Sequence, residues 1–114
     1  MPRIETLGGT NKRTTFTYEG TVSDGVVLTS QSNLPISSRV FETALKEFEG
    51  RTVRGGFSMT TPPPDGFGAW IQANSKALNR RKLTSRHGSF IAAILVHEGR
   101  IGHRRIGNAI FLEF

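Results

Sequence analysis

The chain of 114 residues suffices for one domain, residues 1–114, and carries 15 Lys and Arg against 9 Asp and Glu. It has no cysteine, which excludes disulfides, a thiolate nucleophile and a cysteine-ligated zinc site. No apolar run reaches the roughly 20 residues of a membrane span and the first residues lack a signal-peptide core, so we expect a cytoplasmic protein without a membrane partner.

Residues 1–13 are polar and contain glycine, and we expect them to be a loose N-terminal lead-in. The chain then alternates, with Phe16 and Tyr18 on the same side, until Asp24-Gly25 separates this run from a second apolar one. Asp-Gly between two such runs indicates a β-hairpin, because both turn residues must tolerate positive φ.

The next segment, LPISSRVFETALKEFEG at 34–50, predicts a helix whose apolar residues recur at three- and four-residue spacing. Ser37 is the expected N-cap, and Ile36 and Phe41 have the spacing of a hydrophobic staple. Gly50 stands at the position after the C-cap, where glycine ends helices. The helix has one apolar face and reads as structural.

A second hairpin is predicted from TVRGGFSMTT at 52–61 and FGAWIQAN at 67–74, joined by PPPDG at 62–66. Three prolines cannot lie in a central strand, so they are expected to form a stiff loop. A polyproline recognition motif is the alternative interpretation of that loop.

Residues 75–83 form a basic insertion loop in this interpretation, and a helix is predicted over 84–98. Thr84 or Ser85 is the expected cap, and Gly99 ends the helix. The helix is apolar over most of its surface, so we expect it to be central and buried.

The end of the chain predicts a closing hairpin, with strands at about 100–104 and 109–113 and a turn at 105–108. The chain also resembles itself: Phe16 corresponds to Phe57, an offset of 41, and Phe41 to Phe90, an offset of 49. The eight extra residues are the basic insertion. The predicted fold is α+β, with two β-hairpin–helix units (ββα-ββα), a closing C-terminal β-hairpin and an antiparallel sheet packed by two helices.

The excess positive charge belongs entirely to the last third of the chain. Residues 1–75 hold seven Lys and Arg and seven Asp and Glu, whereas 76–114 hold eight Lys and Arg against only Glu98 and Glu113. Such asymmetry favours a polyanion or an acidic protein surface as partner.

These charges would form one patch if the closing hairpin runs back along the second predicted helix. The second helix is about 22 Å long at 1.5 Å per residue. A strand returning antiparallel to it for about 16 Å would bring Arg104 and Arg105 back to the insertion at its N-terminus, where free N–H groups also favour anions. The predicted anion-binding residues are Lys76, Arg80, Arg81, Lys82, Ser85, Arg86, His87, His103, Arg104 and Arg105.

Catalytic and metal motifs are absent from the sequence. His87 and His97 lie ten residues apart on one predicted helix, about 15 Å in rise, and cannot share an ion. His97 and His103 lack a third ligand. The candidate acid–base groups are Asp24, Asp65, Glu98 and the three histidines, and both aspartates have turn positions that explain them. We therefore expect no catalytic residues, no metal, no cofactor and no enzymatic activity.

Three functions remain open. The first is a small basic binding protein that contacts the phosphates of DNA or RNA; with few aromatic residues near the charges, a duplex or structured RNA is preferred over a single strand. The second is a protein-interaction module, inhibitor or adaptor that docks on an acidic partner surface, such as that of a nucleic-acid enzyme. The third is binding of a small phosphorylated ligand at the N-terminus of the second helix. Homodimerisation through the edge of the closing hairpin also stays open.

Overall fold

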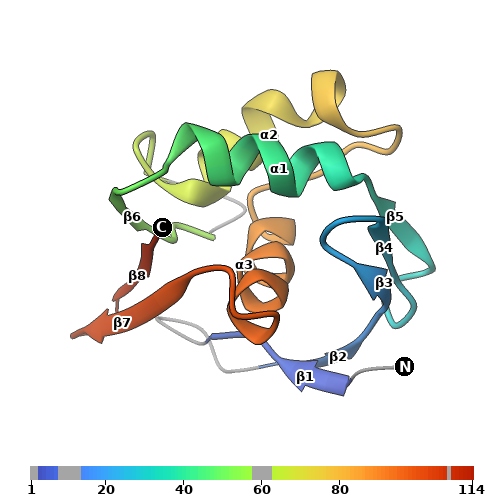
Figure 1. Cartoon of the computed structure of the whole chain (residues 1–114), viewed down its shortest axis with the longest axis horizontal. Helices are drawn as coiled ribbons and strands as arrows, with labels where there is room; N and C mark the ends of the chain where they lie inside the picture. The colour runs from blue at the N-terminus through green and yellow to red at the C-terminus, as the bar shows by residue number, and fades with distance from the viewer. Residues whose placement is uncertain (1–2, 8–13, 58–62, 108) are drawn as a thin grey trace.

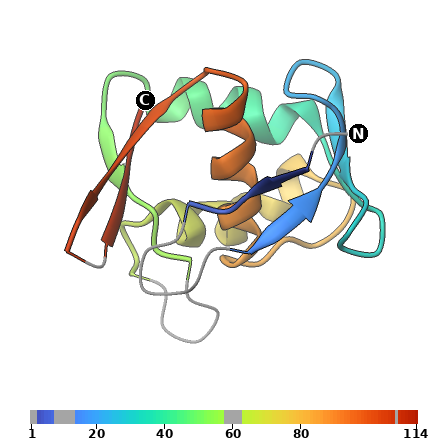
Figure 2. The same cartoon turned by 90° about the horizontal axis from the view of Figure 1, so that it is seen from below.

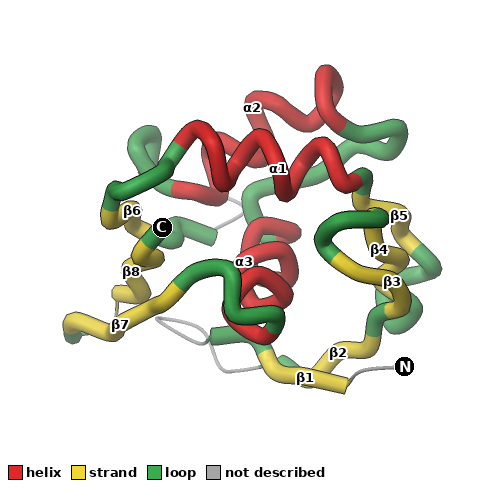
Figure 3. The backbone as a smooth tube through the Cα atoms, in the orientation of Figure 1, coloured by secondary structure: helices red, strands yellow, loops and turns green. Residues whose placement is uncertain are grey.

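In the computed structural model, which describes residues 3–7, 14–57, 63–107 and 109–114, short strands surround and connect three helices (Figures 1 and 3). The elements are β1 (Arg3–Glu5), β2 (Thr15–Thr17), β3 (Glu19–Thr21), β4 (Gly25–Leu28), β5 (Leu34–Ile36), α1 (Ser38–Glu47), β6 (Thr52–Arg54), α2 (Phe67–Leu78), α3 (His87–His97), β7 (Gly102–Ile106) and β8 (Ala109–Glu113). In the described chain the strands form three antiparallel sheets, ordered β1-β2, β3-β4-β5 and β6-β8-β7. The α+β class is confirmed, with three small sheets where one was expected.

Helix α3 is the centre of the fold. Figure 1 shows α1 and α2 above it, β1 and β2 below it, and the other two sheets on either side. Every side chain from Phe90 to Leu95 is buried, as expected for a helix that is apolar all round. The helix begins at His87, later than predicted, and its N-cap is Arg86 where Thr84 or Ser85 was expected.

The first helix and the turn of the first predicted hairpin are confirmed, but the hairpin joins only β3 and β4, because Phe16 of the expected first strand lies on β2 and pairs with β1. Thr21 pairs with Gly25 across the β3–β4 turn, and Gly25 has the positive φ, +92°, that the turn requires. The Oγ of Ser37 accepts a hydrogen bond from Arg39 N and caps α1. Gly50 has φ +73° just beyond the end of this helix. The sheet also gains β5, an edge strand that the sequence-based prediction missed.

The N-terminal segment differs from the prediction. Residues 3–5 of the expected lead-in form β1, which pairs with β2 through Ile4 and Phe16. Phe16 is buried and its ring centroid lies 4.9 Å from that of Phe90, so this strand pair covers one end of α3. Residues 8–13 of the expected lead-in lie outside the described residues.

The return strand expected at 67–74 is wrong, because these residues belong to helix α2. Phe67, Ile71 and Ser75 recur every four residues and are all buried, which is the period of a helix face and not of a strand. The helix runs on to Leu78, so the first four residues of the expected insertion loop are helical.

The turn before α2 explains the error. Gly66 is the N-cap of α2, and its N–H donates to the carbonyl O of Pro63 at 3.0 Å. The proline run therefore leads into a helix start and not into a hairpin loop, and the internal repeat does not extend to a second hairpin. Residues 58–62, at the end of the expected strand and the start of the proline run, lie outside the described residues.

The closing hairpin is confirmed, with its first strand two residues later than predicted. Ile106 pairs with Ala109, and the register continues to Gly102 opposite Glu113. Strand β8 also pairs with β6, so it is the middle strand of its sheet. Its Ile110 and Leu112 side chains are buried, as expected for an interior strand.

Glycines allow α2 and α3 to approach closely. A Cβ on Gly68 of α2 would overlap the carbonyl O of Gly56 and lie 2.9 Å from that of Ser85. A Cβ on Gly88 of α3 would lie 3.2 Å from the Cα of Gly68. In addition, Gly68 N donates to the carbonyl O of Gly55 at 2.8 Å, which joins the end of the β6 segment to α2. This junction sets where α2, and the segment that follows it, lie against α3.

We predict that Gly68→Ala destabilises the fold by about 2–3 kcal/mol through overpacking. Helix propensity alone would give the opposite sign, a gain of about 1 kcal/mol. The measurement is urea unfolding followed by circular dichroism. Gly50→Ala is the comparison, because its Cβ would meet nothing within 4 Å and only its positive φ costs stability, about 1 kcal/mol. A more stable Gly68→Ala protein would contradict the packing argument.

Candidate anion-binding site

The segment that joins α2 to α3, residues 79–86 and here named the linker, runs back alongside α2. One face of α2 carries polar residues that bind the linker. They are Gln72, Ser75 and the C-cap Asn79. The hydrogen bonds run from Ser85 N to Gln72 Oε1 (3.1 Å), from Leu83 N to Ser75 Oγ (2.5 Å) and from Asn79 Nδ2 to the carbonyl O of Arg81 (2.9 Å). The linker backbone is therefore held against the helix along its length.

Asn79 also fixes the linker to the start of α1. Its Oδ1 accepts a hydrogen bond from Ser37 N at 2.7 Å, and its Nδ2 donates to the carbonyl O of Pro35 at 3.0 Å. Further along, the Leu83 side chain is fully buried in the core. One amide thus joins three segments of the chain, and the basic residues beside it extend from a backbone that is held in place.

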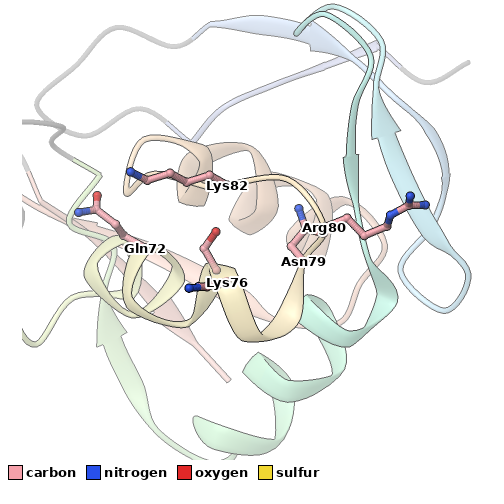
Figure 4. Close-up of a pocket in the computed structure, with 6 residues that line it drawn as sticks. Gln72, Lys76, Asn79, Arg80 and Lys82 are labelled. Atoms are coloured by element: carbon pink, nitrogen blue, oxygen red, sulfur yellow. The ribbon is translucent and has the colours of Figure 1, made fainter.

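A cavity of about 390 Å³ lies between α2 and the linker (Figure 4). Its lining residues are Gln72, Ser75, Lys76, Asn79, Arg80 and Lys82, three of which are cationic and none acidic. Figure 4 shows Lys82 extending toward Gln72, whereas Arg80 extends away from both. The positive charges are therefore spread along the linker and do not converge on one point.

The structure places half of the predicted anion-binding residues on this surface. Five cations are exposed at the end of α2 and on the linker, and we name them the linker cations: Lys76, Arg80, Arg81, Lys82 and Arg86. Ser85 is fully buried. The Nδ1 atom of His87 accepts a hydrogen bond from Thr84 N at 2.9 Å. Neither Ser85 nor this imidazole nitrogen is placed to bind a ligand.

The N-terminus of α3 does not provide the expected anion-binding N–H groups. The N–H groups of His87, Gly88 and Ser89 each donate to the carbonyl oxygen of the residue three positions earlier. The acceptors are Thr84, Ser85 and Arg86, at 3.0, 3.1 and 3.0 Å. Gly88 is buried and packs against Gly68. These donors are already used within the chain, so the charge of the site comes from side chains.

The expected convergence of the two basic clusters is wrong. Figures 1 and 2 both show β7 at one end of the longest axis, whereas the linker runs from the other side of the molecule to the start of α3 in its middle. After α3 the chain turns at Gly99, which has φ +72°, and β7 joins β8 at the side of α3 and does not run back to its N-terminus. Arg104 lies 3.6 Å from Glu113, and Arg105 Nε donates to the carbonyl O of Gly107 at 3.0 Å. His103 lies on the same exposed strand.

The imidazole of His87 is held neutral by its surroundings. Burial lowers its pKa from the ordinary 6.5, and the positive charge of Arg86 lowers it further. A neutral ring is also what the structure requires, because the Nδ1 that accepts from Thr84 N must carry no proton. His87 thus closes the turn between the linker and α3.

The carboxylate of Glu98, a candidate acid–base group, has a structural explanation. Both of its oxygens lie 3.2 Å from Val22 N and accept from it. The pKa of Tyr18 is raised by burial, and also by the charge of Glu98 and a hydrogen bond to it. Glu98 therefore joins the end of α3 to the β3–β4 turn.

Asp24, a further candidate acid–base group, has a structural role in its turn. Asp24 Oδ2 accepts from Thr21 Oγ1 at 3.2 Å, which fits its turn position. Within the described ranges, no group of three or more His, Cys, Asp or Glu residues could hold a metal ion. No helix among them has the length and apolarity to cross a bilayer.

Comparison of the chain with protein-family models, curated proteins and solved structures gave no match in any of the three.

Sequence reasoning missed Gln72, Ser75 and Asn79. Their spacing of three and four residues was a usable signal, but only if residues 67–78 were read as a helix. With 67–74 assigned to a strand, the three polar side chains could not be placed on one face.

We predict that Asn79→Ala destabilises the protein by about 2–3 kcal/mol, because it leaves Ser37 N and two carbonyl groups without their partner. Trypsin should also cleave the linker faster. Asn74→Ala is the matched control on α2, since that side chain makes one bond within the helix, to the carbonyl O of Trp70, and its loss should cost less than about 0.5 kcal/mol. Equal effects in urea unfolding and proteolysis would contradict the assigned role of Asn79.

We predict that stability falls as the pH drops through the folded pKa of His87. This pKa is below the unfolded value of 6.5, so the unfolded state binds more protons; the contribution is present above pH 6.5 and lost in acid. The measurement is the free energy of unfolding between pH 8 and pH 5, compared with His87→Asn, whose Oδ1 can accept from Thr84 N without titrating. Identical pH profiles for the two proteins would exclude this role for His87.

Proposed function

We propose that the protein is a non-catalytic binder of nucleic acid, and that the linker cations contact backbone phosphates. The observation that supports this most is the row of exposed cations on a hydrogen-bonded backbone, beside a cavity without acidic residues. A backbone that is ordered before binding loses less conformational entropy when the ligand arrives.

The spread of the charges favours an extended polyanion over a small phosphorylated ligand. Lys82 and Arg80 extend in different directions from the linker (Figure 4), so a single phosphate cannot contact both as a clamp would. A nucleic-acid backbone presents phosphates at regular intervals and can meet the cations one after another.

The surface also suits nucleic acid better than a protein partner. Protein interfaces have an apolar core with aromatic anchors. In the described part of the chain, the large apolar residue that is exposed is Ile106, on β7 and away from the linker. Trp70 of α2 packs against Phe48 and Phe67 and does not line the cavity beside the linker cations, so a duplex or structured RNA is the preferred form.

We predict that duplex DNA or RNA binds with a log–log salt slope of about −3 to −4.5, the value for three to five phosphate contacts. The triple change Lys76→Ala, Arg80→Ala and Lys82→Ala should lower affinity by about tenfold or more and make the slope shallower by about three. Fluorescence anisotropy with a labelled 20-base-pair duplex, titrated at several salt concentrations, measures both quantities.

The control removes the same charge elsewhere: Arg3→Ala, Lys46→Ala and Arg54→Ala change three exposed cations on β1, α1 and β6. This variant should keep most of the wild-type affinity. Equal losses in the two triple variants would mean that net charge alone governs binding. No affinity of the wild type for either nucleic acid would reject the proposal and favour an acidic protein partner.

A further inference from the structure

We infer that β7 carries a second, independent nucleic-acid contact, so that one molecule can bridge two nucleic-acid segments. This inference rests on the proposed function for its first contact. It uses the part of the positive charge that the linker does not explain, which the fold places at one end of the molecule (Figures 1 and 2).

Strand β7 is basic and exposed along its whole length. All five of its residues, Gly102–Ile106, are exposed, and it is the edge strand of its sheet. Arg104 pairs with Phe111 and Arg105 with Ile110, so the two guanidinium groups start from opposite faces of the strand. Ile106 follows them at the end of the hairpin with 56% of its surface exposed.

This combination suits a groove of a nucleic acid. Arginines on both faces of a strand can reach phosphates on both sides of a groove, and the exposed aliphatic side chain that follows them can contact sugars and base edges. The ion pair of Arg104 with Glu113 does not prevent this, because both groups are on the surface, where such a pair contributes little.

Pairing of β7 with the same strand of a second copy is disfavoured. The edge of β7 carries two adjacent arginines and a histidine, and edge-to-edge pairing of identical strands would place these cations near one another. Charged residues on an edge strand are a common means of preventing such pairing. The partner that complements this strand is therefore anionic.

The two surfaces can act independently because of the distance between them. In both views β7 lies at one end of the longest axis, along which the molecule extends 32 Å, and the linker lies between the other end and the start of α3. Electrostatic interactions in water are screened over about 8 Å at physiological salt. A duplex bound along the linker therefore leaves β7 open to a second duplex.

The test is a bridging assay. A biotinylated 20-base-pair duplex on beads and a fluorescent duplex of the same length are mixed with the protein, and fluorescence retained on the beads is measured. The wild type should retain the second duplex. Arg104→Ala with Arg105→Ala should lower retention by about tenfold, while its affinity for one duplex stays within about threefold of wild type. The triple linker variant should also lose bridging, and its affinity for one duplex should fall by about tenfold or more.

The outcomes separate the two proposals. If the wild type binds one duplex but retains no second one, bridging is rejected and the proposed function stands. If the double arginine variant bridges as well as the wild type, β7 is not the second contact, and bridging arises from self-association, which sedimentation analysis of the protein alone would show. If the wild type binds no duplex, both proposals are rejected.

Discussion

The burial of α3 on every side is the constraint on which the rest of the structure depends. A helix with no polar face has no stable place at a surface, so other parts of the chain must cover it completely. The strands are short and in small groups, which would be unstable by themselves in water. Strands such as β2, β4 and β8 gain stability by burying side chains in the core that surrounds α3, whereas β3 and β7 stay exposed and are held by pairing with their neighbouring strands.

Helix α2 connects this core to the candidate site because one of its faces is apolar and another is polar. One face buries Phe67 and Ile71, and another presents Gln72, Ser75 and the C-cap Asn79 to the linker. The core thus fixes the position of the helix, and the helix fixes the linker. Basic side chains that would otherwise extend from a loose loop gain a defined arrangement, although none of them takes part in the packing.

Much of the fold could be predicted from local signals in the sequence. The Asp24-Gly25 turn, the Ser37 cap and the apolar run of α3 each depend on a few neighbouring residues, and each appears as expected. Helix α2 was missed because the prolines and the aromatic residues near Gly66 favour a hairpin, although Phe67 and Ile71 have helical spacing. The Ser32-Asn33 turn into β5, where both residues have positive φ, was also missed.

The candidate site could be predicted only in its charges. The linker cations are adjacent in the sequence and stay together in space. The position of Arg104 and Arg105 depends on the direction of the chain after Gly99, which long-range pairing of β8 with β6 decides and local patterns do not show. The hydrogen bonds that Gln72 and Ser75 make to the linker could not be predicted either, because they require residues 67–78 to be assigned to a helix first.

The central place of β8 has a consequence for the order of events during folding. Thr52 of β6 pairs with Glu113 of β8, so among the described strands β6 has no ladder partner until residues 109–113 are available. Closing a loop of this length carries an entropic cost, and folds rich in such distant pairings form slowly. On a ribosome, β1 to β5 could pair as they emerge, whereas β6 would wait for residues 109–113 and leave this side of α3 uncovered until then.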